Sequence, residues 1–191
     1  MKFTKIKADT MSTIQMNAGI ICSQFNVSTG EVADTDILGA TTGGVQFSAT
    51  PTFNDFGEDI DNCPKNMKEL KVLDEWEAKM SGTFVAIGSA TAKLLAAVAD
   101  IANNKITPRN DLEQTDFTDV WWVGDYTDVN TGTNAGFMAI HLMNALNTGG
   151  FQIQTSDKGK GQFAFEFTGH YSMSAQDTVP FEIYVKAGSS N

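Results

Sequence analysis

Hydrophobic and polar side chains alternate along much of this chain, a pattern typical of β-strands that bury one face and expose the other. Four stretches follow this period of two: residues 45–53, 76–86, 163–171 and 181–185. In the third, Phe163, Phe165 and Phe167 share one face, while Glu166 and Thr168 lie on the other. Turn-forming runs such as SDKGKG separate the stretches, so the pattern predicts antiparallel strands joined by hairpin connections.

One segment departs from this period. In SATAKLLAAVADIANN, apolar residues recur at intervals of three or four, which indicates a helix over about residues 89–102 with Ser89 as its N-cap. The predicted fold class is therefore mainly β, an antiparallel β-sandwich or small barrel with one flanking α-helix and a long inter-strand loop at about residues 54–72. No repeat or linker divides the 191 residues. A single domain over residues 1–191 is expected, ending in a frayed polar tail at 187–191.

Charge narrows the range of functions. The chain has 23 acidic residues against 13 Lys and Arg, for a net charge of −10. Proteins that grip nucleic acid by its phosphates need clustered Lys and Arg, because counterion release supplies much of that affinity. This chain has the opposite balance, so it is expected to repel DNA and not to bind it.

Candidate chemistry is sparse. Cys22 and Cys63 form no metal-binding spacing and are expected to be reduced. His141 and His170 each fall inside a predicted strand, and no residue pattern singles out a catalytic set. Neither an enzyme activity nor a cofactor or metal is expected. The start of the chain lacks the apolar region of a signal peptide, and no run reaches the ~20 apolar residues that span a bilayer, so location in a cytoplasm without membrane insertion is expected.

The long loop poses the main question. Its sequence NDFGEDIDNCPKNMKEL mixes carboxylates with apolar residues. It could be an irregular calcium site, a solvated acidic loop, or an arm that contacts another subunit. Long loops inside compact domains are usually functional or disordered, and a contact arm would account for the apolar residues. The candidate contact residues are Phe53, Asp55, Phe56, Glu58, Asp59, Ile60 and Asp61.

Four stretches resemble the major tail proteins, or tail tube proteins, of long-tailed, non-contractile phages and prophages of Gram-positive bacteria. They are DIDNCPKNMKELKVLDEWEAKMSGTF, DFTDVWWVGDYTD, GFMAIHLMNALNTGGF and DKGKGQFAFEFTGHYSMSAQDTVPFEIYVKAG. Together they cover most of residues 43–188, whereas residues 1–40 match less distinctly.

This resemblance implies a structural protein of the virion tail, assembled in the host cytoplasm. Such proteins form rings, typically hexameric, that stack into a hollow tube through which DNA passes without specific binding. Ring neighbours extend one another's sheets, and a loop after an early strand reaches a neighbouring subunit or ring. A tail initiator or tip protein, a tape measure protein and a terminator protein are the partners that the family implies.

If such a tube forms, alternation suggests which side chains face its lumen, because the opposite face of each strand must build the core. The lumen candidates are Glu77, Lys79, Gln162, Glu166 and His170. Their exposure to outside solvent is an equally open interpretation.

Two other functions are compatible with these patterns. A β-sandwich of a tail tip could recognise a receptor or carbohydrate, since Trp121 and Trp122 point to opposite faces of their strand and one could line a groove. A secretion-system tube protein would share the ring architecture. An enzyme is the least favoured class, because it would need a cleft with a perturbed titratable group.

Overall fold

The computed structural model describes residues 5–7, 10–126 and 136–187. Most of the predicted polar tail, from residue 188 onward, lies outside these residues. The described strands are β1 (Ile20–Cys22), β2 (Ile37–Asp55), β3 (Lys71–Ile87), β4 (Ala99–Ala102), β5 (Lys105–Pro108), β6 (Thr118–Asp125), β7 (Phe137–Asn147), β8 (Phe163–Thr168) and β9 (Phe181–Lys186). Short 3-10 helices lie at Thr10–Thr13, Asp34–Asp36, Lys68–Leu70 and Gln114–Asp116, and the α-helix is α1 (Ser89–Leu95).

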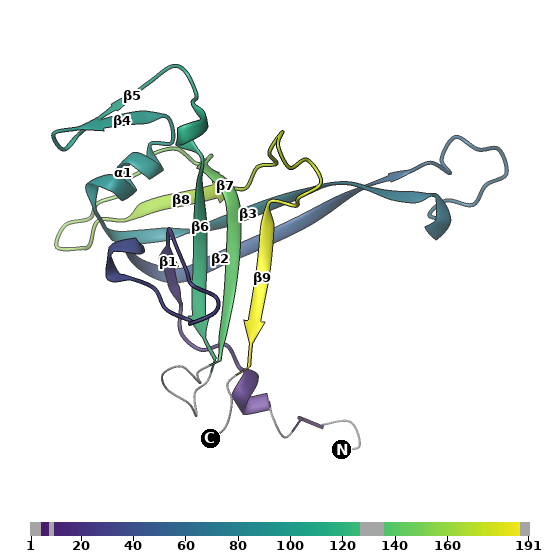
Figure 1. Cartoon of the computed structure of the whole chain (residues 1–191), viewed down its shortest axis with the longest axis horizontal. Helices are drawn as coiled ribbons and strands as arrows, with labels where there is room; N and C mark the ends of the chain where they lie inside the picture. Colours follow the sequence, from purple (N-terminus) through teal and green to yellow (C-terminus); the bar gives the residue numbers. More distant parts are fainter. Residues whose placement is uncertain (1–4, 8–9, 127–135, 188–191) are drawn as a thin grey trace.

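Seven strands form one antiparallel sheet in the order β6-β1-β2-β3-β8-β7-β9 (Figure 1). Because β6 also pairs with β7, from Thr118↔Ala145 to Asp125↔Phe137, the sheet curls until it nearly closes into a ring. The predicted fold class, mainly β and antiparallel with one flanking helix, is thereby confirmed. The strands β4 and β5 form a separate two-stranded sheet beside α1.

This nearly closed sheet is called the barrel below. Its interior is filled by the apolar side chains that the alternation in the sequence assigned to the core. Phe165 and Phe167 are buried, and the Phe165 ring lies 4.6 Å from that of Phe84 on β3. Glu166, between them in sequence, is exposed. Burying large aromatic side chains contributes on the order of 1.5–3 kcal/mol each, so this stripe is a main source of the barrel's stability.

A second apolar cluster lies on the outer face of β6 and β7. Trp121 packs there against Phe25 and Phe137. Trp122 instead faces the interior of the barrel, and its Nε1–H donates a hydrogen bond of 2.9 Å to the Ala18 carbonyl oxygen. Residues 23–36 supply part of this outer cluster, so β6 is buried on both sides. Trp121 retains only 8% exposure, which leaves little of that side chain to line a binding groove.

The helix is shorter than the sequence pattern predicts, and Ser89 is its first residue, not its N-cap. The chain leaves the helix at Leu95, adopts a left-handed conformation at Ala97 (φ +62°), and enters β4. The prediction of helix over residues 96–102 is therefore wrong. Asn103 and Asn104 both have positive φ, as the two central residues of a type I′ turn require, and they connect β4 to β5 in a tight hairpin. This Asn-Asn pair was the missed signal.

The strands β2 and β3 are longer than predicted, so the loop between them shortens from about 54–72 to 56–70. The glycine-rich run before Val45 lies within β2. Gly43 and Gly44, with φ of +76° and +82°, form a bulge between the pairs Thr42↔Thr83 and Val45↔Gly82. Glycine is suited to this position because a Cβ is disfavoured at such φ values.

Candidate functional site

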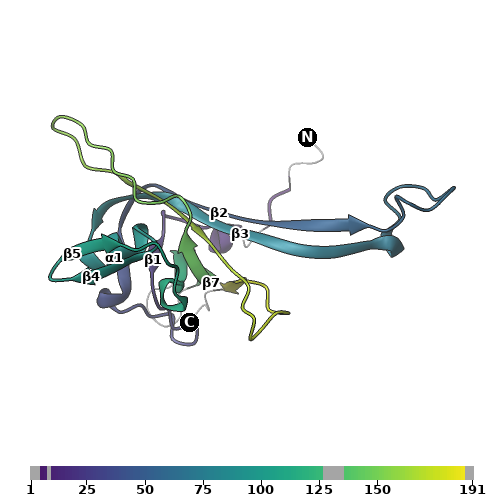
Figure 2. The same cartoon turned by 90° about the horizontal axis from the view of Figure 1, so that it is seen from above.

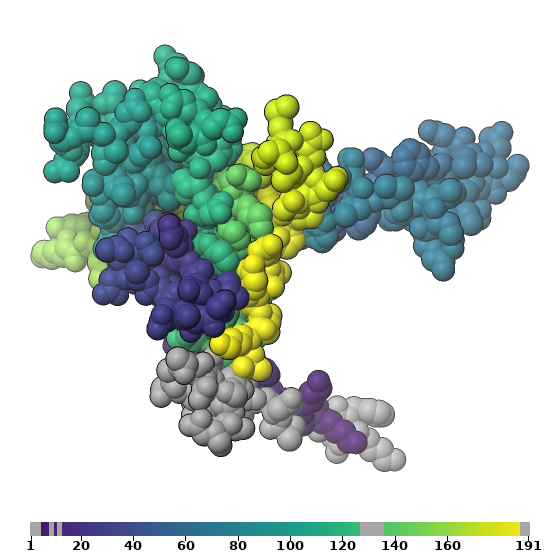
Figure 3. Space-filling view, in the orientation of Figure 1, coloured from purple at the N-terminus to yellow at the C-terminus, as the bar shows by residue number. Residues whose placement is uncertain are grey.

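The most conspicuous feature is a ribbon formed by the outer parts of β2 and β3, residues 52–75. It extends from the barrel as a bare two-stranded hairpin (Figures 1 and 3). On the barrel side, β8 pairs with β3 only over Lys79–Phe84, and β1 pairs with β2 only at Ile37 and Gly39. An isolated two-stranded hairpin is marginally stable in water, so the ribbon lacks the support that a protein usually gives its strands.

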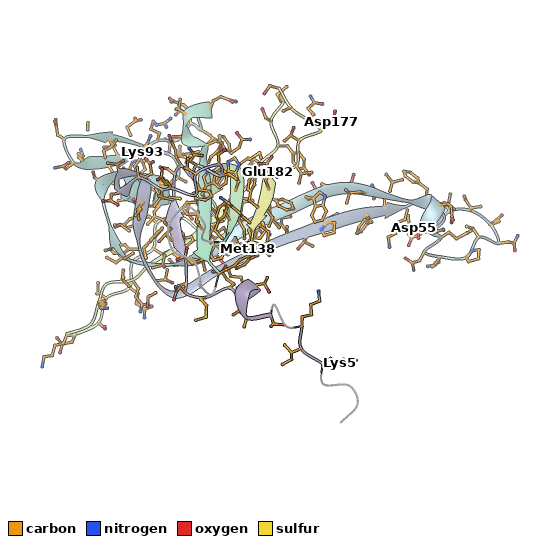
Figure 4. All side chains as sticks on the ribbon, turned by 60° about the horizontal axis from the view of Figure 1, so that its bottom comes forward. Lys5, Asp55, Lys93, Met138, Asp177 and Glu182 are labelled. Atoms are coloured by element: carbon orange, nitrogen blue, oxygen red, sulfur yellow. The ribbon has the colours of Figure 1, made fainter. Side chains whose placement is uncertain are left out.

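A compact tip loop, residues 56–70, ends the ribbon. Asp55 organises it: Oδ1 accepts a hydrogen bond from the Gly57 N–H and Oδ2 accepts one from the Asn66 N–H, both at 2.9 Å. Phe56 N–H donates to the Leu70 carbonyl at 3.0 Å and closes the loop. Figure 4 shows Asp55 at the base of this loop, far from Met138 and Glu182 on the barrel.

The hydrogen bonds from Gly57 and Asn66 lower the pKa of the Asp55 carboxyl below its usual value. Their contribution to loop order is therefore complete above the ordinary carboxyl pKa and is lost as the pH falls through the lowered one. A Cβ on Gly57 would lie 3.1 Å from Asp55 Oδ1 and 3.2 Å from Cys63 Sγ, so the loop interior is closely packed. Asp55 shapes the tip from inside, whereas Glu58, Asp59 and Asp61 are exposed.

The ribbon also carries apolar side chains that its own chain does not cover. Phe56 and Ile60 on the tip loop are 63% and 51% exposed, and Phe53, paired across the ribbon with Leu73, is 50% exposed. The exposed apolar residues of the ribbon are Phe53, Phe56, Ile60, Met67, Val72 and Leu73. A hairpin too thin to bury these side chains, yet rich in them, has the character of a surface that packs against a partner.

Three of the predicted lumen residues come together on the outer face of the sheet. Lys79 Nζ lies 2.5 Å from Glu77 Oε1, and the hydrogen bond and charge of Glu77, with a smaller effect of Glu166, raise the pKa of Lys79. Glu166 reaches this group because Ser81, two residues after Lys79, is its cross-strand partner. Apart from Glu75, which precedes Glu77 on the same face, the surrounding side chains of this polar face are uncharged: Gln46, Ser48, Thr50, Ser81, Thr83, Thr148 and Thr168.

The other two lumen candidates lie elsewhere. Gln162 precedes β8 and forms a bridge with Gln154, at the margin of the polar face. His170 was predicted inside a strand, and this is wrong because β8 ends at Thr168. Its Nδ1 lies 3.1 Å from the Asn144 carbonyl oxygen and its ring packs edge-on against Phe117, so it is not part of the Glu77–Lys79–Glu166 group.

The sequence did not reveal the surroundings of His141, which lies on β7 as predicted. Its Nε2 is 3.0 Å from Asp119 Oδ2, its Nδ1 is 3.6 Å from Glu182 Oε2, and its ring stacks on Trp121 at 3.9 Å. These contacts link β6, β7 and β9, so the cluster connects three strands. Only the cross-strand register brings the two carboxylates to one imidazole.

The tip-loop carboxylates do not form a metal-binding cluster. Within the described ranges, no three His, Cys, Asp or Glu side chains are grouped so that they could hold a metal ion. The carboxylates of the tip loop are thus not gathered around a common centre. Of the helices that the structure describes, none is long and apolar enough to cross a membrane.

The two thiols should differ sharply in reactivity. Burial, with a smaller effect of Asp36, raises the pKa of Cys22 to about 12, whereas Cys63 lies on the tip loop and is partly exposed. The thiolate is the reactive form. We expect one thiol per native chain to react with a disulfide reagent at pH 8, and two after unfolding. The Cys63→Ser variant should show none when native, and two fast-reacting thiols in the native wild type would contradict this.

Comparison with protein-family models and with curated proteins finds no match to this chain. An interpretation of function therefore depends on the ribbon, the polar face and the charge of the chain.

Proposed function

We propose that the protein is a structural subunit of a phage tail tube, which polymerises into stacked rings, typically hexameric, and forms a channel for DNA. The ribbon is the observation that carries this proposal. It extends beyond the barrel, leaves its apolar residues uncovered, and gains support only if another molecule packs on it.

The proposed tube gives the ribbon a particular kind of contact. In it, the ribbon of one copy would pack on a different part of the next copy, which makes the contact heterologous. Heterologous contacts generate rings when the rotation closes and filaments when it does not. A tube of stacked rings uses both outcomes, with closure inside each ring and open growth along the axis.

The polar face of β2, β3 and β8 is suited to line a channel that DNA crosses. Its side chains are mostly neutral hydroxyls and amides, and its charged group of Glu77, Lys79 and Glu166 has a formal net charge of −1 (one Lys against two Glu). Glu77 pairs with the lysine, so no unpaired cation is offered to phosphates. With a net charge of −10 on every chain, such a wall would let DNA pass without retaining it.

This function requires no catalytic group or cofactor. Its partners are other copies of the chain and the tail initiator or tip, tape measure and terminator proteins expected of such a tail. The site of action would be the virion tail, after assembly in the host cytoplasm.

Negative-stain electron microscopy of the purified protein, combined with light scattering, tests the proposal. We expect hollow filaments with a regular axial repeat. They should form more readily at about 0.5 M than at about 0.05 M salt, because salt screens repulsion between chains of charge −10. A protein that forms only monomers or a small closed oligomer at every salt and protein concentration would contradict it.

A further inference from the structure

We propose that the protein binds a neutral sugar ring in a pocket at the end of the barrel where β6 begins. The pocket lies between the 3-10 helix at Gln114–Asp116, the last part of β7 and the segment that follows β8, residues 170–174. Its volume is about 400 Å³, within the range of about 300–1,000 Å³ that small-molecule sites occupy. This function is separate from tube formation and can be measured on the unassembled chain.

A bulge in β7 builds the first wall of the pocket. Between Thr118 and Val120 the register of the β6–β7 pair shifts, so that two residues of β7 oppose one of β6. The second of the two, Asn144, has a φ of +46°, in the left-handed region that is uncommon for residues other than glycine. Its N–H donates to Asp119 Oδ1 at 3.0 Å, which holds this conformation. Bulges and left-handed residues are frequent beside binding sites, where they redirect a side chain.

Asn144 and His170 hold each other in place at this wall. Asn144 Nδ2–H donates to the His170 carbonyl oxygen at 3.1 Å, and the Asn144 carbonyl oxygen lies 3.1 Å from His170 Nδ1. A carbonyl oxygen only accepts, so in a neutral imidazole Nδ1 carries the hydrogen and Nε2 is an acceptor. Within the described part of the chain, neither Asn144 Oδ1 nor His170 Nε2 has a hydrogen-bond partner. Two acceptors on side chains that are already ordered can therefore serve a ligand at little entropic cost.

The remaining walls add donors and apolar surface. Gln114 is exposed, and its amide can both donate and accept. The Tyr171 hydroxyl oxygen accepts the Trp76 N–H at 2.9 Å, which leaves the hydroxyl hydrogen to donate. Phe117 and Met173, the latter 91% exposed, contribute apolar surface. The pocket thus combines hydrogen-bonding groups of both kinds with aromatic and thioether side chains.

This combination selects the class of ligand. None of the described residues that line the pocket is an Asp, Glu, Lys or Arg, so the pocket offers no ion pair, and the net charge of −10 disfavours an anion. A wholly apolar ligand would leave the amides and the hydroxyl without partners. A sugar ring has hydroxyl groups at its edge that donate and accept, and C–H faces that pack on aromatic side chains. A neutral pyranose therefore satisfies both sets of groups.

The pocket is apart from the surface proposed for assembly. Figure 2 shows the loop between β8 and β9, which supplies one wall, projecting from the barrel well away from the tip of the ribbon, and Figure 1 shows the same separation. Sugar binding and the contact made by the tip loop can therefore be tested independently.

Binding is measured on the unassembled full chain from the amide NMR spectrum of the isotope-labelled protein. The probes are the methyl glycosides of glucose, galactose and N-acetylglucosamine. We expect at least one of them to bind with a dissociation constant of about 1–10 mM, as suits a ligand of this size. It should shift the signals of Asn144, His170 and residues 171–174. Glycerol should shift them less, because it has hydroxyl groups but no ring.

Two variants remove polar groups from the pocket. Gln114→Ala removes the exposed amide, and Asn144→Gly removes Oδ1 while glycine accepts the left-handed backbone. Each should weaken binding about 5-fold or more, the effect of one lost hydrogen bond. Gln46→Ala is the matched control, because it removes an exposed glutamine on β2 and should bind as the wild type does.

Each outcome bears on the pocket alone. The absence of binding by all three glycosides up to about 50 mM would overturn the inference. Equal shifts with glycerol, shifts confined to residues outside the pocket, or unchanged binding in a pocket variant would do the same. Weaker binding in every pocket variant that circular dichroism shows to be folded, with the Gln46→Ala control unchanged, supports it. The proposed tube depends on none of these results, and failure to form tubes would leave the pocket unaffected.

Discussion

Replacing Phe56 and Ile60 with serine should abolish tube formation while leaving the barrel folded. Both side chains lie on the tip loop with more than half of their surface exposed, at 63% and 51%. Fully burying such a side chain contributes about 1.5–3 kcal/mol. Every subunit of a ring would lose this free energy of burial, so the total loss for a ring is several times larger. Electron microscopy and sedimentation at matched concentrations would measure the result.

The barrel should tolerate these two substitutions. Exposed positions that make no special contact usually change stability by less than about 0.5 kcal/mol, so the melting temperature should stay near that of the wild type. Leu112→Ser and Met173→Ser make a matched control pair, since both residues are exposed, at 52% and 91%, and lie outside the ribbon. The ribbon would not be part of the assembly contact if the Phe56 and Ile60 variant formed normal tubes, or if the control pair lost tube formation to the same extent.

Replacing Asp116 with alanine should cause the largest loss of stability among removals of a single carboxylate in the described part of the chain, because Asp116 is the carboxylate that is buried there. Arg109 places its guanidinium among three carboxylates: Nη2 lies 2.6 Å from Asp116, Nη1 lies 3.0 Å from Glu113, and Nε lies 3.0 Å from Asp100. The Asp116 side chain is fully buried, and its second oxygen accepts the Glu113 N–H at 2.9 Å. One carboxylate thus holds both the arginine and the turn that leads into β6.

The alanine variant would leave a backbone N–H and part of the guanidinium without partners. Removing one member of a buried pair costs about 3 kcal/mol or more, which at this chain length lowers the melting temperature by roughly 6–12 °C. Asp100→Ala is the control, because the Asp100 side chain is 66% exposed and solvent-exposed ion pairs contribute about 1 kcal/mol or less. Thermal and urea unfolding measure both variants. Equal losses would show that burial of Asp116 does not set the cost.

The alternation of apolar and polar residues predicted burial correctly where one face of a strand packs on the core. Phe165 and Phe167 alternate with Glu166, and the structure buries the first two and exposes the third. Alternation is weak on the ribbon, because both of its faces are exposed and neither face has to be apolar to build a core. Consequently β2 and β3 run further than predicted, to Asp55 and from Lys71, and the tip loop is correspondingly shorter.

Two local errors have backbone causes. A helical spacing of apolar residues continues past Leu95, but the left-handed Ala97 ends the helix and the Asn103–Asn104 turn converts the remainder into a hairpin. His170 continues the alternation of β8 in sequence, yet the strand stops at Thr168 and the histidine packs against Phe117. Periodicity records which residues could share a face, not where the backbone leaves the sheet.

The sequence by itself determined the mainly β class, the aromatic stripe of β8, the strong negative charge and the presence of apolar residues among the carboxylates near Phe56 and Ile60. These properties depend on residues close together in the chain. Only the tertiary structure decided that β2 and β3 leave the barrel as a bare ribbon, that Glu166 joins Glu77 and Lys79, and that Asn144 and His170 meet at one pocket. Strand pairing joins residues far apart in sequence, and a period of two is the same whichever partner a strand takes.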